Sequence, residues 1–148
     1  MQGRKIHWGW NVLIIVSILL CIGAFILHYK NWVRVKPEKL TVLSGIYYRE
    51  LPFSEMDSVV MVDRLPELER LHGFSAGSVE KGIFLDSIHP DNEISVFVDN
   101  LRYPKIRVVH RDSLLMFLNF KDTVETRKYY SYLLEKLAKE QNELPDKE

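Results

Sequence analysis

The longest uninterrupted apolar stretch in the chain runs from Val12 to Leu27. With residues 8–11 added, it reaches about the 20 residues needed to cross the hydrocarbon core of a bilayer. A buried helix of a soluble domain usually keeps one polar face, and this run has none. Only a helix satisfies its own backbone polar groups across lipid. We therefore predict a transmembrane helix at the end of an N-terminal segment comprising residues 1–30.

Aromatic and basic residues flank the apolar run at both ends. Aromatic rings with a polar atom and basic side chains are enriched where a membrane helix meets the two lipid headgroup layers. The sequence therefore predicts a set of membrane-interface residues: Trp8, Trp10, Tyr29, Lys30, Trp32, Arg34 and Lys36.

A cleaved signal peptide is the main alternative for this segment, because Arg4 and Lys5 give it a charged start. However, no small-x-small cleavage site follows the apolar run. A lipoprotein signal would need a small residue before Cys21, and the bulky Leu20 stands there. We therefore expect an uncleaved anchor.

The balance of basic residues predicts the orientation of the anchor. Two basic residues precede the span, whereas four follow it closely. Basic residues concentrate on the cytoplasmic side of membrane helices. We therefore expect a single-pass protein with its C-terminal domain in the cytoplasm.

We expect residues 31–39 to be a basic juxtamembrane linker that is broken by Pro37. After this linker, the sequence changes to short runs of β-branched and aromatic residues. Such runs, separated by turn residues, predict strands. We expect Ser54–Met56 to form a turn and the punctuated segment Leu65–Ser78 to be irregular, with one or two helical turns in its first half. The predicted strands are Leu40–Leu43, Ile46–Leu51, Ser58–Asp63, Gly82–Ser87, Glu93–Val98, Ile106–His110 and Ser113–Phe120.

A helix is predicted to close the domain. Asp122 is a suitable N-terminal cap, and Glu125 three residues later completes a box-like start. The tail at residues 141–148 contains Pro145 and mixed charges, so we expect it to fray. The helix carries an apolar stripe at helical spacing, expected to pack on the sheet: Thr126, Tyr129, Tyr130, Leu133, Leu134 and Leu137.

The order of these elements resembles a family of bacterial pleckstrin-homology-like (PH-like) domains over residues 40–140. The resemblance implies a mainly β, α+β fold: a barrel of about seven strands capped by a C-terminal amphipathic helix. Membrane-tethered members are common in the family, which implies a bacterial cytoplasmic membrane location, but the family implies no activity. The residues that carry the resemblance are Gly45-Ile46-Tyr47-Tyr48, Leu51-Pro52-Phe53, Met56, Val59–Val62, Leu65-Pro66, Arg70, Gly73, Gly82, Phe84, Phe97-Val98, Ile106, Val108 and Phe117-Leu118-Asn119.

The net charge of zero conceals an asymmetry along the chain. Residues 1–40 carry six Lys/Arg and one Glu, a net charge of +5, and the remaining residues carry a net charge of −5. Basic residues beside a span meet anionic headgroups. The acidic domain argues against nucleic acid as a partner, because phosphate backbones need a basic surface.

Motifs for catalysis or metal binding are missing from the sequence. None of the five histidines pairs at a metal-ligand spacing, and there is no nucleophile elbow or phosphate-binding glycine loop. The carboxylates and histidine between Asp86 and Glu93 fit a solvated turn better than a metal site. We expect no enzyme activity, no catalytic residue, no metal and no cofactor.

Two binding roles remain open. A module that scaffolds unknown protein partners at the bilayer would use a sheet edge, the groove beside the C-terminal helix, or the loop Phe74–Val79. A lipid- or anion-sensing module would use cations at the open end of the barrel, although interleaved glutamates weaken that field and favour an ordinary solvated loop. The candidate anion ligands are Arg64, Arg70, His72 and Lys81.

Overall fold

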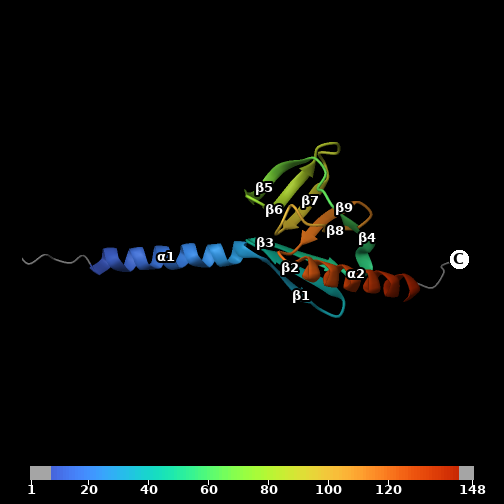
Figure 1. The fold of residues 1–148 in the computed structure, drawn as a ribbon, viewed down its shortest axis with the longest axis horizontal. Helices are drawn as coiled ribbons and strands as arrows, with labels where there is room; N and C mark the ends of the chain where they lie inside the picture. The colour runs from blue at the N-terminus through green and yellow to red at the C-terminus, as the bar shows by residue number, and fades with distance from the viewer. Residues whose placement is uncertain (1–7, 144–148) are drawn as a thin grey trace, which may run out of the picture.

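The computed structural model describes residues 8–143 of the chain. Its first element is the helix α1 (Trp8–Tyr29), which projects away from the rest of the molecule (Figure 1). None of its residues is buried, and the helix is long and apolar enough to cross a membrane. The predicted apolar helix is therefore confirmed. Arg4, Lys5 and residues 144–148 of the predicted tail lie outside the described residues.

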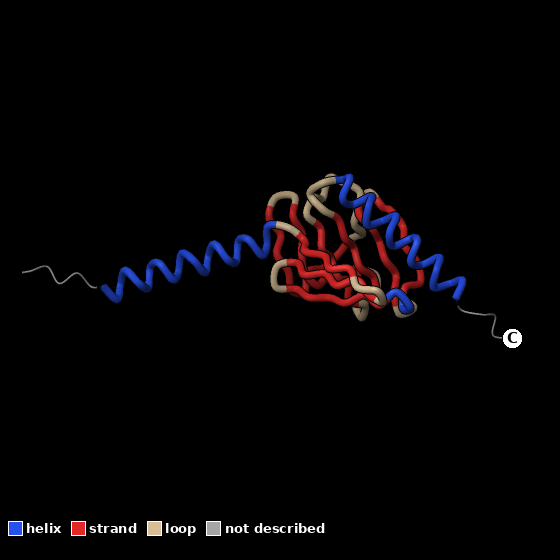
Figure 2. Tube along the Cα trace, turned by 90° about the horizontal axis from the view of Figure 1, so that it is seen from below, coloured by secondary structure: helices blue, strands red, loops and turns tan. Residues whose placement is uncertain are grey.

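Strands form two separate sheets (Figure 2). The smaller sheet is antiparallel, with the order β1-β2-β3. The larger sheet has the order β4-β8-β9-β7-β6-β5, and only its β7–β9 pair is parallel. The strands are β1 (Asn31–Val35), β2 (Lys39–Ser44), β3 (Tyr47–Pro52), β4 (Met56–Val62), β5 (Leu68–Ala76), β6 (Val79–Asp86), β7 (Glu93–Val98), β8 (Lys105–His110) and β9 (Leu114–Asn119).

The mainly β fold is confirmed, but the predicted closed barrel of about seven strands is wrong. The sheets of three and six strands do not join by strand pairing, so each keeps its own edges. The two additional strands come from segments expected to lack strands. Residues 31–35 of the expected linker form β1, and most of the expected irregular segment 65–78 forms β5.

The glycines that suggested irregular structure instead shape the β5–β6 hairpin. Gly77 forms its turn with a φ of +59°, and Gly73 lies opposite Gly82 in the strand pair. Gly82 has a φ of +142°, and a Cβ atom there would lie 2.2 Å from the carbonyl oxygen of His72. Only glycine permits so close a backbone approach. These residues therefore allow the hairpin to bend without ending its strands.

The main core lies between the two sheets and is closed by the helix α2 (Thr123–Glu143). A single-turn 3-10 helix, η1 (Phe53–Glu55), confirms the turn expected after β3, and Phe53 is fully buried. The rings of Phe120 and Tyr129 stack at 4.8 Å between centroids. The buried residues of this core are Leu40, Val42, Leu51, Phe53, Met56, Val59, Phe97, Ile106, Val108, Met116, Leu118, Phe120 and Leu133.

The predicted cap of α2 is confirmed: the Asp122 side chain accepts the backbone N–H of Val124 at 2.8 Å, while the part predicted for Glu125 stays a prediction. Its apolar stripe is confirmed except at Leu134, which is 37% exposed. Tyr132 packs against the core instead. Leu134 lies about 100° around the helix from the fully buried Leu133, and therefore at the margin of the face that packs on the core.

Candidate functional site at the helix–domain junction

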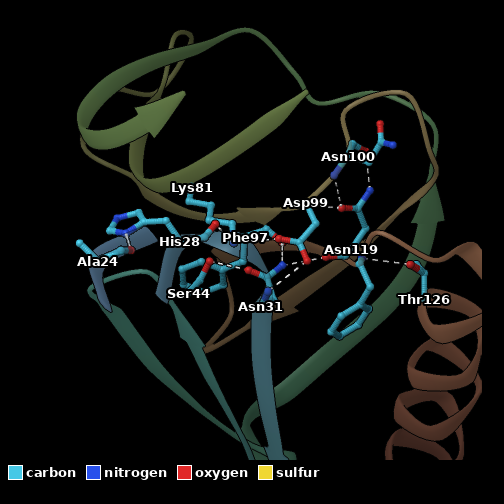
Figure 3. Close-up of polar contacts among 11 residues, drawn as sticks. Ala24, His28, Asn31, Ser44, Lys81, Phe97, Asp99, Asn100, Asn119 and Thr126 are labelled. Atoms are coloured by element: carbon cyan, nitrogen blue, oxygen red, sulfur yellow. Dashed lines mark hydrogen bonds and ion pairs between the residues drawn. The ribbon is translucent and has the colours of Figure 1, made fainter. Parts of the chain in front are cut away.

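The end of α1 is bound to the domain by contacts from three segments. The backbone N–H of Gly45 donates to the Leu27 carbonyl at 3.1 Å. Lys81 Nζ donates to the His28 carbonyl at 3.1 Å (Figure 3). The His28 ring meets the Phe74 ring edge-on, with 5.2 Å between centroids. These contacts satisfy carbonyls that the last turn of a helix leaves unpaired. The helix therefore leaves the domain in a defined direction.

A fully buried ion pair lies directly beneath this helix end. Lys81 Nζ on β6 lies 2.8 Å from Asp99 Oδ1, and both side chains are 0% exposed. Lys81 is paired with Phe97 across the sheet, so its side chain points into the space between the two sheets. Burial lowers the pKa of Lys81, and the hydrogen bond and charge of Asp99 oppose this shift. A buried charge of this kind is tolerated only with its partner in place.

Asn31, the first residue of β1, connects this ion pair to both sheets. Its backbone N–H donates to Asp99 Oδ2 at 3.0 Å. Its side-chain amide donates to the carbonyls of Phe97 at 2.6 Å and Asn119 at 2.7 Å, and its Oδ1 accepts from the Ser44 hydroxyl. Asn31 is 3% exposed and joins the chain leaving α1 to β2, β7 and β9 at once.

Asn119, at the end of β9, holds the loop that follows β7. Its Oδ1 accepts the backbone N–H groups of Asp99 at 2.8 Å and Asn100 at 3.1 Å. Its Nδ2 donates to the carbonyls of Asn100 at 2.7 Å and Pro104 at 3.2 Å. The amide therefore fixes the position of the Asp99 carboxylate, while the next residue, Phe120, donates its N–H to Thr126 of α2 (Figure 3).

The arrangement of these groups suits attachment better than catalysis. The Lys81 and Asp99 charges neutralise each other, and neither side chain reaches solvent. Asn31 and Asn119 use their amide groups on backbone atoms and on Ser44. The junction therefore transmits the position of α1 to both sheets. Among residues 8–143, no group of three or more His, Cys, Asp or Glu is placed to hold a metal ion.

The four predicted anion ligands do not come together at the junction. Lys81, predicted to be an anion ligand at an open barrel end, is instead enclosed and paired with Asp99. Arg64 lies in the loop between β4 and β5, and Arg70 and His72 lie on β5 with a bulge between them. Within the described part of the chain, no hydrogen bond or ion pair joins these three side chains, so their role in binding stays a prediction.

The predicted interface residues lie at both ends of α1 and along β1. Trp8 and Trp10 are exposed at the start of the helix. At the other end, Lys121 Nζ lies 3.1 Å from the ring centroid of Tyr29, and Lys30 Nζ lies 4.6 Å from that of Trp32. Arg34 and Lys36 line a groove of about 400 Å³ on the outer face of the smaller sheet, with Trp32, Val33, Thr41, Leu43 and Tyr48.

The sequence interpretation missed Asn31, Ser44, Asp99 and Asn119 as junction residues. Asn119 carried a usable signal, because it interrupts an otherwise apolar strand. A buried amide needs hydrogen-bond partners, so its position indicated a polar network. The other three stand at apparent breaks between elements, where polar residues are common and carry no such signal.

A second groove, of about 430 Å³, is lined by β3 and by the end of the larger sheet where β7 and β9 begin. It is lined by Tyr48, Arg49, Glu50, Glu93, Ser95, His110, Arg111, Leu114 and Leu115. Arg49 crosses from the smaller sheet to donate to the Ser95 hydroxyl at 3.1 Å. Nδ1 of His110 is enclosed and has no hydrogen-bond partner among the described residues. Burial, followed by the nearby Arg111 charge, lowers the pKa of His110.

This shift predicts a loss of stability in mild acid. Because the pKa of His110 in the folded domain lies below its ordinary value of 6.5, the unfolded chain binds the proton first as the pH falls. His110 therefore destabilises the fold progressively from about pH 6.5 downward, by up to about 1.4 kcal/mol per pH unit, and has no such effect above it. His110→Asn is expected to flatten the dependence of the unfolding free energy on pH between about pH 7 and 5.

Urea unfolding of the full chain in detergent at several pH values measures this slope. Gln141→Asn, at an exposed position on α2, changes no titratable group and is the control, expected to retain the wild-type slope. Equal slopes for His110→Asn and the wild type would show that His110 does not titrate in this way.

No family model, no curated protein and no solved structure matches the chain. The resemblance to PH-like domains therefore rests on the sequence pattern alone.

Proposed function

We propose that this chain is a single-pass membrane protein whose PH-like domain is a non-enzymatic binding module that recruits a protein partner at the bilayer. The apolar helix α1, with none of its residues buried, supports the anchor. Four basic residues after the span against two before it support a cytoplasmic domain. The resemblance to bacterial PH-like domains supports a bacterial cytoplasmic membrane.

The observation that carries the recruiting role is the free edge of the larger sheet. β5 is its terminal strand and pairs with β6 alone, so its other edge has no strand partner within residues 8–143. It is nine residues long, and Leu71 is 42% exposed on it. An unpaired strand edge offers backbone donors and acceptors to an extended peptide, and neighbouring side chains supply specificity.

The junction adds a reason for placing this edge beside a membrane. Lys81 and Asp99 connect β6 and the end of β7 to the last turn of α1. Since β5 pairs directly with β6, its edge has a fixed relation to the helix and hence to the bilayer. A flexible tether would not provide such orientation. The protein module is favoured over the anion sensor because the buried Lys81 leaves only Arg64, Arg70 and His72 for an anion.

Site-specific photo-crosslinking in the cells that make the protein tests the recruiting role. A photoreactive residue at Leu71 is expected to give one discrete protein adduct, because the partner strand would lie against β5. The same residue at Val124, which is 68% exposed on α2, is the matched control and is expected to give none.

A substitution at the proposed binding edge makes the crosslinking test more specific. The photoreactive group is moved to Ser75 and Leu71 is changed to Asp. Leu71→Asp is expected to remove about 1.4 kcal/mol of apolar contact with the partner, which corresponds to about tenfold weaker binding. The adduct should fall accordingly, while Val124→Asp leaves it unchanged. Equal adducts from Leu71 and Val124, or none from either, would count against partner binding at this edge.

A further inference from the structure

Exposed apolar side chains gather around the point where α1 enters the domain. Ile46, at the tip of the β2–β3 turn, is 74% exposed, and Phe74 on β5 is 40% exposed. Gly45 is hydrogen-bonded to the carbonyl of Leu27, and Phe74 contacts the His28 ring. The β2–β3 turn and the part of β5 that carries Phe74 therefore lie beside the last turn of α1 (Figure 1).

The length of α1 sets the depth of these two segments in a bilayer. Its 22 residues span about 33 Å, close to the 30 Å or so of a bilayer hydrocarbon core. With Trp8 and Trp10 in one headgroup layer, the last turn of the helix reaches the opposite one. Since Gly45 is bonded to Leu27 within that turn, Ile46 reaches the same depth. We infer that the Gly45–Ile46 turn and Phe74 insert into the lipid headgroup layer and form a second membrane contact beside the helix.

The charges around this contact also suit a bilayer. Lys121 lies over the ring of Tyr29, and Lys30 lies over that of Trp32, so two cations stand at the helix exit. Apolar side chains flanked by cations match the acyl boundary and the phosphates of lipid headgroups. The occupant is therefore the bilayer that α1 already crosses, because the contact is continuous with that helix. It would hold the domain against the membrane at two points.

This inference rests on the proposed membrane span of α1, and the test must separate the two. Cys21 is the only cysteine in the chain, and it lies within α1. An environment-sensitive fluorophore on the native Cys21 reports the span. Cys21→Ala removes the native cysteine, and Ile46→Cys in that background carries the same fluorophore at the proposed contact. Ile88→Cys in the same background is the matched control. Ile88 is 79% exposed in the turn between β6 and β7, at the end of β6 away from α1 (Figure 1).

The full chain is reconstituted into phosphatidylcholine–phosphatidylglycerol vesicles that contain nitroxide-labelled lipids. The Cys21 label is expected to be quenched by nitroxides on the acyl chain and the Ile46→Cys label by nitroxides in the headgroup layer. The Ile88→Cys label is expected to respond only to aqueous quenchers. If the Cys21 label is quenched but the Ile46→Cys label behaves like Ile88→Cys, the second contact is overturned while the span stands. If Cys21 is not quenched either, the span itself fails and the inference fails with it.

Discussion

Replacing Lys81 with methionine is expected to lower the free energy of unfolding of the domain by about 3–5 kcal/mol, the usual result of breaking a buried ion pair. Methionine fills a similar volume, but it leaves the Asp99 carboxylate enclosed without a counter-ion. It also removes the donor to the His28 carbonyl at the end of α1. In a domain of this size such a loss lowers the melting temperature by about 10 °C or more. Thermal unfolding of the full chain in detergent, followed by circular dichroism, measures it.

Two further variants distinguish the stability lost by breaking the ion pair from the stability lost by removing any lysine. Lys128→Met on the exposed surface of α2 is expected to change stability by less than about 0.5 kcal/mol. Adding Asp99→Asn to Lys81→Met should recover part of the loss, because the amide keeps an oxygen for the N–H of Asn31 without burying a charge. If Lys81→Met is no more harmful than Lys128→Met, the buried pair does not hold the junction together.

The elements that could be predicted from the sequence are those with a strong local signal. The apolar run of α1 has one compatible structure in lipid, and the β-branched strand Glu93–Val98 was predicted at its observed bounds. The cap at Asp122 followed from the chemistry of a helix start, which involves only neighbouring residues. Each of these features is decided within a few residues of chain, so an isolated sequence is enough to find it.

The two sheets could not be predicted because their form depends on distant contacts. Residues 31–35 alternate weakly and carry an arginine, so only their pairing with β2 makes them a strand. In β5 the glycines look like turn residues when only the local sequence is considered. Their actual role, which is to let two backbones approach closely, depends on β6 lying opposite. A barrel of seven strands was therefore expected where nine strands form two sheets.

Burial explains why the position expected for Lys81 was wrong. Lysine is almost never fully buried, so Lys81 was expected at the open end of a barrel with other cations. Its partner Asp99 lies on another strand end, and no local pattern relates the two. Lys105 has the same character: it is 1% exposed and donates to the carbonyls of Asp63 at 2.7 Å and Leu101 at 2.6 Å. Burial lowers the pKa of Lys105 as it does that of Lys81.

Asn31→Ala is expected to destabilise the domain by about 2–4 kcal/mol, because an enclosed acceptor without a donor costs about 1–3 kcal/mol. The substitution leaves the carbonyls of Phe97 and Asn119 without their amide donor and removes the acceptor of the Ser44 hydroxyl. The backbone N–H to Asp99 remains, so the ion pair keeps one of its contacts. Asn142→Ala, at an exposed position on α2, is the matched control and should change stability by less than about 0.5 kcal/mol.

The same variant tests whether the junction sets the direction of α1. Spin labels on Cys21 and on Ile88→Cys report the distance between α1 and the far end of the domain in lipid nanodiscs. A single narrow distribution is expected for the parent chain, and a broader one for Asn31→Ala at a temperature where the domain remains folded. Equal widths with reduced stability would show that Asn31 stabilises the fold without orienting the helix, because Gly45 and Lys81 would then suffice for that orientation.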